Sequence, residues 1–141
     1  MVALLLTVDA VRRPVQELLA QHDELTYQQY NVLRILRGAM PKGLPTLEIG
    51  TRMIERTPGV TRLIDRLAHK GLVERERSTE DRRQVLCRLT AAGEELLSTL
   101  DQPIAELDEA VVGALDDGEV RGLIHVLDRL RMHVSGLKVT H

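Results

Sequence analysis

The segment TEDRRQV, residues 79–85, places Asp81 directly before two adjacent arginines, Arg82 and Arg83. Short runs on either side have the patterns of β-strands, so the segment is predicted to form the tip of a β-hairpin. Guanidinium groups at such a tip either stay in water or bind anions, because a narrow cation suits phosphates and the minor groove of a DNA duplex. The segment alone leaves both interpretations open.

A helix before this hairpin carries a second group of side chains that are able to bind nucleic acid. Thr57 and Pro58 predict its start, because a hydroxyl caps free N–H groups and proline is tolerated at the first helical position. With Gly59 they leave the helix N-terminus small and open, so backbone N–H groups can approach a phosphate. The outward face carries the side chains that can reach base edges or phosphates in a major groove, which are Thr61, Arg62 and Arg66.

The same helix also fits an interpretation without a ligand. Over residues 57–69 it has one apolar face at i, i+3, i+4 and i+7, formed by Val60, Leu63, Ile64 and Leu67. On the opposite face, the arginines could simply pair with Asp65 or Glu55. Two other arginines, Arg52 and Arg75, are weaker candidates for phosphate contacts.

The distribution of charge favours a local contact with a polyanion. The formal net charge is −2, so the chain as a whole is not a polyelectrolyte binder. From Arg52 to Arg88 there are 10 Lys/Arg against 6 Asp/Glu, whereas the other residues hold 9 against 15. A basic middle between acidic flanks is typical of a nucleic-acid footprint on an acidic protein, although random clustering gives the same counts. The aromatic content of 1% argues against single-strand modules that stack bases.

Periodicity predicts a mainly helical chain with one hairpin. Pro14 and Pro103 each interrupt a helical pattern; the first either kinks its helix or starts a new one, and the second is expected to kink its helix. The segment GAMPKGLP, residues 38–45, is predicted to be a loop because it holds two glycines and two prolines. The first four predicted helices span residues 4–21, 26–37, 46–53 and 57–69. Two strands follow, over residues 72–77 and 85–89, and then a long helix capped by Thr90 and a last helix capped by Asp116 and Glu119. Thr26 and Thr46 are the predicted first residues of the second and third helices, and Thr46 is also the predicted cap of the third.

A short helix, a tight turn, an amphipathic helix and a hairpin form a winged helix-turn-helix. The predicted fold class is therefore mainly α (α+β), in a single domain over residues 1–141 with a DNA-binding lobe over about 26–89. The helices outside the lobe, about 1–21 and 90–141, carry apolar stripes, and a chain of 141 residues has little else to bury them against. They are predicted to be dimerisation helices of a homodimer; the alternative is that the stripes pack within one chain.

The stretch RTPGVTRLIDRLAHKGLVERERSTEDRRQVLCRLTAAGEELL resembles the MarR family of winged helix-turn-helix transcriptional regulators. The matching parts are VTRLIDRLAHKGLV, the wing core DRR, LTAAGEELL and, upstream, YQQYNVLRIL, so the likeness covers most of residues 25–100. Members are typically homodimers that bind pseudo-palindromic operators in double-stranded DNA, usually as repressors. The resemblance implies that residues 57–69 form the recognition helix, with DNA contacts at Thr57, Gly59, Thr61, Arg62 and Arg66. It also implies that Arg83 enters the minor groove, that Asp81 helps to hold the wing tip, and that Arg82 is a second wing contact.

Many members of this family release DNA when a small, often phenolic, ligand binds, whereas others respond to no ligand. The resemblance implies that such a pocket would lie where the first, second and fifth helices meet the DNA-binding lobe. The polar candidates near that place are Arg12, Arg13, Tyr27 and Tyr30. Two other functions remain open: a winged helix that docks a partner protein, and a small-molecule-binding module without a DNA-dependent function.

No motif indicates an enzyme, a metal site or a cofactor. The five histidines are scattered without an i, i+4 pair, and neither a nucleophile motif nor a glycine-rich phosphate loop is present. The single cysteine, Cys87, alternates with Val85 and Leu89 and is predicted to be a buried structural thiol; the peroxide-sensing branch of the family uses an N-terminal cysteine instead. The apolar run VALLL is too short to span a bilayer and precedes the first arginines, unlike a signal peptide, so a cytoplasmic protein is expected.

Overall fold

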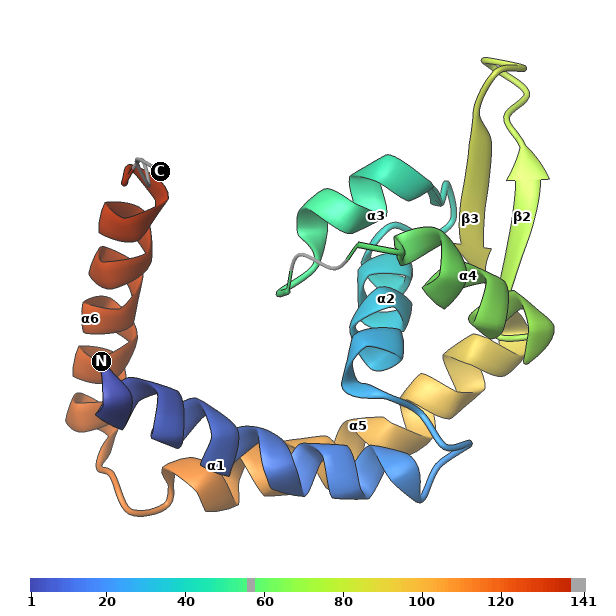
Figure 1. Ribbon diagram of the computed structural model, residues 1–141. Coiled ribbons are helices and arrows are strands. Elements are labelled where there is room, and N and C mark those ends of the chain that lie inside the picture. Colours follow the sequence, from blue (N-terminus) through green and yellow to red (C-terminus); the bar gives the residue numbers. More distant parts are fainter. Residues whose placement is uncertain (56–57, 138–141) are drawn as a thin grey trace. The chain divides into compact units, whose positions relative to one another are not determined.

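A computed structural model describes residues 1–55 and 58–137 of the chain (Figure 1). In chain order its elements are α1 (Val2–Ala20), α2 (Tyr27–Gly38), β1 (Leu44–Pro45), α3 (Thr46–Arg52), α4 (Val60–His69), β2 (Val73–Arg77), β3 (Val85–Leu89), α5 (Ala91–Val112) and α6 (Asp117–Ser135). The chain forms two compact units, Met1–Ile104 and Ala105–His141, and α5 continues from the first into the second. The predicted fold class, mainly helical with a winged helix-turn-helix, is confirmed.

Helices α2 and α5 begin where their capping residues predict. The Thr26 hydroxyl accepts a hydrogen bond from the Gln29 N–H, and the Gln29 side chain accepts one from the Thr26 N–H, both at 3.1 Å. This reciprocal pair is a capping box, which satisfies two free donors at once. At α5, the Thr90 hydroxyl accepts from the Gly93 N–H at 3.1 Å and donates to the Gly71 carbonyl at 2.7 Å. Thr90 thereby also ties the start of α5 to the end of α4.

The structure settles two predicted details of the helices, one at Thr46 and one at Pro14. Thr46 is the first residue of α3 rather than its cap, because Pro45 occupies the capping position. The Thr46 hydroxyl instead lies 3.8 Å from the Cys87 sulfur. Pro14 starts no new helix, since α1 runs through it without interruption, as α5 runs through Pro103.

Helix α4 begins three residues later than predicted. Gly59 adopts φ +103°, a left-handed conformation that a right-handed helix does not contain, and α4 therefore begins at Val60. Pro58 lies in the preceding turn instead of at the first helical position. Thr57, the predicted cap, lies outside the described residues.

The end of α4 agrees with the prediction. The Gly71 N–H bonds to the Ala68 carbonyl and the Leu72 N–H to the Leu67 carbonyl, both at 3.0 Å. Gly71 has φ +74°, so this is the glycine-terminated motif in which the last free carbonyls of a helix find donors. The chain then turns directly into β2.

The sheet has three antiparallel strands in the order β1–β3–β2. The β2–β3 hairpin was predicted, and its register pairs Val73 with Leu89 and Arg77 with Val85. Cys87 is fully buried and Leu89 nearly so, as expected, but Val85 is 42% exposed and Leu86 is buried in its place. Val85 was mispredicted because it lies at the far end of the hairpin, beyond the core.

Strand β1 lies in the segment of residues 38–45, which was predicted to be a loop from its glycines and prolines. A strand of two residues is too short to show alternation in the sequence. Leu44 pairs with Cys87, and Pro45 with Leu86. Just before β1, Gly43 has φ +79°, and a Cβ there would lie 2.5 Å from the Cys87 carbonyl oxygen. Only glycine therefore allows the loop to approach β3 this closely.

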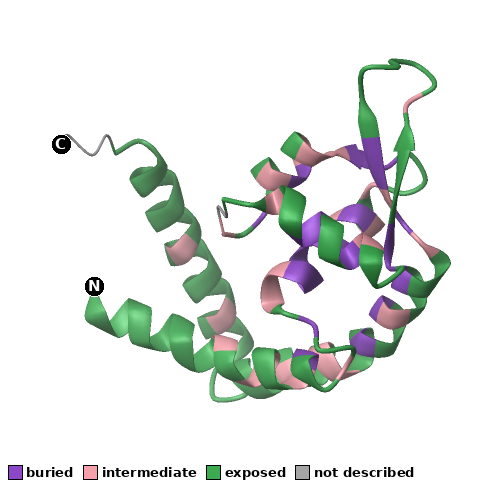
Figure 2. Ribbon diagram, turned by 45° about the vertical axis from the view of Figure 1, so that its right-hand side comes forward, coloured by how far each residue is buried: buried purple, intermediate pink, exposed green. Residues whose placement is uncertain are grey.

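The core of the first unit lies between α2, α3, α4, the sheet and the neighbouring parts of α1 and α5 (Figure 2). It is built almost entirely from aliphatic side chains, and the largest fully buried ones are Leu19, Leu33, Leu36, Ile49, Ile64, Leu67, Leu97 and Leu100. The predicted apolar face of α4 is confirmed at three of its four positions, since Leu63, Ile64 and Leu67 are buried and Val60 is half-buried.

The second unit contains the end of α5 and all of α6. Asp116 and Glu119 form the predicted capping box, with bonds of 2.8 and 2.9 Å between each side chain and the other residue's N–H. No residue of α6 is buried, and most of them are exposed (Figure 2). Within the described residues, no helix is long and apolar enough to cross a membrane.

Candidate DNA-binding surface

Helix α4 presents a polar, positively charged face opposite its buried one. Thr61, Arg62 and Arg66 are exposed, as predicted, and Pro58 and Gly59 are exposed in the turn that leads into the helix. Within residues 1–55 and 58–137, no carboxylate forms an ion pair with Arg62 or Arg66. Both guanidinium groups are therefore available to a ligand.

The carboxylates that could have neutralised these arginines are bound elsewhere. Asp65 forms an ion pair with Arg75 of β2. Glu55 lies 2.5 Å from the Arg12 guanidinium. The interpretation in which Arg62 and Arg66 merely pair with Asp65 or Glu55 is thus wrong for the described structure.

Arg52 and Arg75, the weaker candidates for phosphate contacts, are both engaged in ion pairs. Arg52 binds Glu48 one helical turn earlier on α3, and Arg75 binds Asp65. An arginine whose charge is already balanced attracts a phosphate less strongly, so these two contribute less than the arginines of α4.

The wing tip is held together by short-range hydrogen bonds. The Ser78 hydroxyl accepts from the N–H groups of Glu80 and Asp81, each at 3.2 Å. The Asp81 carboxylate accepts from the Arg83 N–H at 3.0 Å. Backbone bonds of 2.9 Å from Gln84 to Asp81 and from Ser78 to Gln84 close the loop. The tip is therefore an ordered turn at the far end of the β2–β3 hairpin (Figure 1).

Asp81, Arg82 and Arg83 are all exposed at this tip. The structure brings Asp81 to the backbone of Arg83, rather than to its guanidinium, and so leaves the positive charge unbalanced. Among the described residues, neither Arg82 nor Arg83 forms an ion pair. Sequence reasoning did not single out Ser78, although a serine that precedes an aspartate by three residues is a common turn signal.

At the base of the wing, ion pairing stiffens the hairpin. Arg88 of β3 binds Glu76 of β2 at 2.8 Å, and its Nε donates to the Lys42 carbonyl at 3.2 Å. These contacts join β2, β3 and the loop before β1. A shallow cleft of about 260 Å³ lies along this side of the wing, lined by Lys42, Glu76, Arg77, Ser78, Thr79, Glu80, Asp81, Gln84, Leu86 and Arg88.

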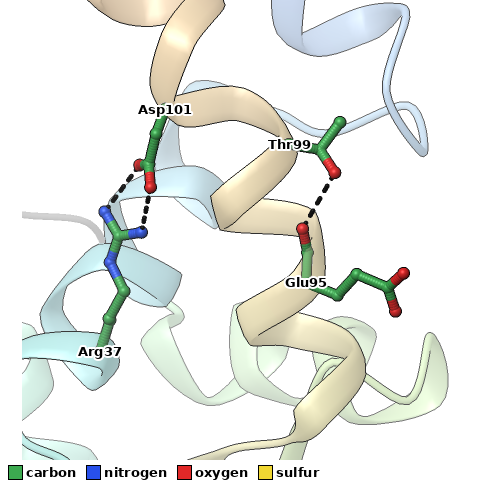
Figure 3. A network of polar contacts seen from close by, with 4 residues as sticks. All are labelled: Arg37, Glu95, Thr99 and Asp101. Atoms are coloured by element: carbon green, nitrogen blue, oxygen red, sulfur yellow. Dashed lines mark hydrogen bonds and ion pairs between the residues drawn. The ribbon is translucent and has the colours of Figure 1, made fainter.

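A two-pronged ion pair joins the helix-turn-helix to α5 (Figure 3). Both terminal nitrogens of Arg37, in the last turn of α2, lie 2.9 Å from the two carboxylate oxygens of Asp101. These hydrogen bonds hold the pKa of Asp101 below its ordinary value of 3.8 and raise the pKa of Arg37. Sequence reasoning missed the pair because its members lie 64 residues apart.

The four residues predicted to bind a ligand make different contacts in the structure. The Arg12 guanidinium lies over the Tyr27 ring, 5.5 Å from its centroid. Arg13 instead pairs with Asp9 on the exposed side of α1, at 2.9 Å. Tyr30 is buried, and its ring contacts the guanidinium of Arg34 at 5.8 Å.

Comparisons with known proteins agree with this geometry. The model of the MarR family matches residues 25–85. The HTH-type transcriptional regulator TtmR of Methylorubrum extorquens is 41% identical to this chain over 92 residues. The alignment covers 65% of this chain and 46% of TtmR, so the chain spans about half the length of that relative. A MarR transcription factor from Planctomyces limnophilus has a crystal structure with a TM-score of 0.68 and 41% identity, covering 89% of this chain and 90% of that one. A mutant MarR from E. coli, solved in complex with operator DNA, has a TM-score of 0.80 and 27% identity, covering 91% and 90%.

The fold, the exposed arginines of α4 and the wing are those of a winged helix-turn-helix protein, the class of the transcriptional regulators that the chain resembles. The chain belongs to the MarR family.

Proposed function

We propose that the protein is a homodimeric repressor that binds a pseudo-palindromic operator in double-stranded DNA. The observation that carries this proposal is the set of exposed guanidinium groups on α4 and at the wing tip, which have no ion-pair partner among the described residues; they are Arg62, Arg66, Arg82 and Arg83. Unbalanced arginines on a recognition helix and on a wing suit the two grooves of a duplex.

Each group has a distinct role in this proposal. Thr61, Arg62 and Arg66 face the major groove, where arginine can bind the edge of guanine through two hydrogen bonds. Arg82 and Arg83 reach the adjacent minor groove. The exposed turn at Pro58 and Gly59 lets the backbone approach a phosphate, and Thr57 is assigned to the same contact from the sequence alone.

A homodimer is supported by apolar surface that the single chain leaves in water. On α1, Val2, Leu5 and Leu6 are 61–69% exposed. On α6, the exposed apolar side chains are Leu123, Ile124, Val126, Leu130, Met132 and Val134. Side chains of this size at the surface of a small protein usually mark an interface. A two-fold dimer would present two copies of α4 about 34 Å apart, one turn of duplex.

DNA binding is tested on a duplex that the parent protein selects from a randomised pool. Arg62→Ala should weaken binding by roughly 1–3 kcal/mol and relax the preference at one base pair of each half-site. Arg83→Ala should weaken binding as well, because it removes a minor-groove contact. Arg13→Ala, on the exposed side of α1, is the matched control and should bind like the parent.

The proposal is wrong if Arg62→Ala and Arg83→Ala both bind as tightly as the parent. The salt dependence of binding separates it from a winged helix that docks a protein partner. Phosphate contacts make affinity fall steeply with salt, whereas a docking surface of ordinary composition does not. Sedimentation of the free protein tests the dimer.

A small aromatic acid as effector is a further part of the proposal. Tyr27 offers a ring face beside the Arg12 guanidinium, and the carboxylate of an aromatic acid would compete with Glu55 for Arg12. Calorimetry with salicylate, in the absence and presence of the selected duplex, tests this part. Binding to the free protein with no effect on DNA affinity would support a small-molecule-binding module instead.

A further inference from the structure

Helix α1 contacts the helix-turn-helix through one face, which is apolar at one end and charged at the other. Arg12, Val15 and Leu19 follow the spacing i, i+3, i+7 and therefore share this face. Leu19 is fully buried, Val15 packs against the core, and Arg12 is half-buried. Arg12 thus extends the contact of α1 beyond the apolar core.

The Arg12 guanidinium binds the segment that connects α3 to α4. Its Nη1 lies 2.5 Å from the Glu55 Oε1, and its plane lies over the ring of Tyr27, the first residue of α2. The two charged side chains are 31% and 35% exposed, so they are screened by water less than a surface pair. Three parts of the fold therefore meet at one guanidinium.

A second polar contact of the connecting segment is a hydrogen bond to α2. The N–H of Ile54 donates to the Asn31 side-chain oxygen at 3.0 Å, and Asn31 is buried in α2. Met53 is also buried, which fixes the beginning of the segment. Glu55 is the last described residue before the gap, and Pro58 and Gly59 then lead into α4. Of these contacts, the Arg12–Glu55 pair lies nearest in sequence to the recognition helix.

We infer that the Arg12–Glu55 ion pair positions the recognition helix: it couples α1 to the segment that leads into α4 and so sets the affinity for DNA. The inference rests on the proposed function, since it concerns the same DNA-binding surface. Without the pair, the segment loses one of its contacts with the rest of the fold, and α4 has more freedom to lose when DNA binds. That loss of freedom opposes association, so affinity falls.

The direction in which DNA affinity changes after substitution of Glu55 distinguishes positioning of α4 from a simple effect of charge. Glu55 is an acid close in sequence to a surface that binds a polyanion. If it acted only through its charge, Glu55→Gln would strengthen DNA binding by removing repulsion from the phosphates. If it positions α4 through Arg12, the same substitution weakens binding.

The experiment measures dissociation constants by fluorescence anisotropy, on the duplex that the parent selects from a randomised pool. Glu55→Gln and Arg12→Met should each raise Kd by about fivefold, the size expected for a partly shielded ion pair. The double variant should be no weaker than the weaker single one, because both remove the same contact. Exchanging the two residues, Arg12→Glu with Glu55→Arg, keeps the net charge and should recover most of the affinity.

Arg13→Met is the matched control, because it removes the same charge from the adjacent position of α1. Arg13 pairs only with Asp9 on its own helix, and both side chains are more than two-thirds exposed. Its Kd should stay within about twofold of the parent value. A loss equal to that of Arg12→Met would show a general charge effect and overturn the inference.

Two further outcomes would also overturn it. The first is a Glu55→Gln variant that binds DNA as tightly as the parent or more tightly. In the second, each variant is measured at a temperature that lies the same interval below its own thermal midpoint, and its loss of affinity then disappears. That result would mean that the ion pair only stabilises the fold. Failure of the parent to select or bind any duplex would instead refute the proposed function.

Discussion

Asp81 at the wing tip offers a test in which geometry and charge predict opposite results. Its carboxylate accepts the Arg83 N–H at 3.0 Å, and so fixes the direction in which the Arg83 side chain leaves the backbone. Asp81→Ala removes this acceptor together with the negative charge. Asp81→Asn removes the charge and keeps an oxygen in the same place. Comparing the two variants isolates the hydrogen bond.

The expected magnitude follows from the contacts at the tip. Asp81→Ala removes one of three side-chain-to-backbone bonds, while the two bonds to Ser78 remain. A single bond of this kind contributes about 1 kcal/mol net. In a dimer with two wings the loss would be about 2 kcal/mol, or about thirtyfold in Kd. Asp81→Asn should bind DNA as tightly as the parent or more tightly, because it only removes a charge that repels phosphates.

The assay is the anisotropy titration on the selected duplex, with both variants at the same salt concentration. Circular dichroism should show unchanged helix content, because the tip is remote from the core. Equal affinity of Asp81→Ala and Asp81→Asn would refute the view that Asp81 orients Arg83. The carboxylate would then act only through its charge.

Three other predictions concern stability. Gly43→Ala should lower the free energy of unfolding, measured by urea titration, by about 2–4 kcal/mol. The alanine would have a left-handed backbone, and its Cβ would collide with the Cys87 carbonyl. An unchanged urea midpoint would show that β1 can move away from β3. Because the Arg37 contact depresses the pKa of Asp101, its stabilisation is present above pH 3.8, the ordinary value, and is lost as the pH falls through the folded-state value. Asp101→Asn should therefore lower stability at pH 7 by less than about 1 kcal/mol, since the pair is partly exposed, and the difference from the parent should shrink as the pH falls through the folded-state value. Glu24→Asn should stabilise the protein by about 0.5 kcal/mol, because Glu24 has φ +51° and asparagine adopts that conformation more readily; no rise in the thermal midpoint would contradict this.

Several features of the fold were predictable because their causes lie within a few residues of each other. The capping boxes at Thr26 and Asp116 depend on a partner three residues ahead. The buried face of α4 follows from helical spacing, and the same spacing places Arg62 and Arg66 on the outward face. The wing tip follows from turn residues between two short strands. Local patterns of this kind determine which side chains face water.

The tertiary structure decided what depends on residues far apart in the chain. Strand β1 exists because Gly43 can approach β3, and no alternation in the sequence marks it. The start of α4 moved because Gly59 adopts a left-handed conformation, which the run Thr-Pro-Gly permits without requiring.

The sequence by itself determined the helices, the wing and the arginines that project from them, since each rests on contacts within one or two turns. Only the tertiary structure decided which of the charges are balanced. It engages Asp65 with Arg75 and Glu55 with Arg12, and leaves Arg62 without a carboxylate among the described residues. The reason is physical: the strength of an ion pair depends on distance and burial, and sequence separation specifies neither.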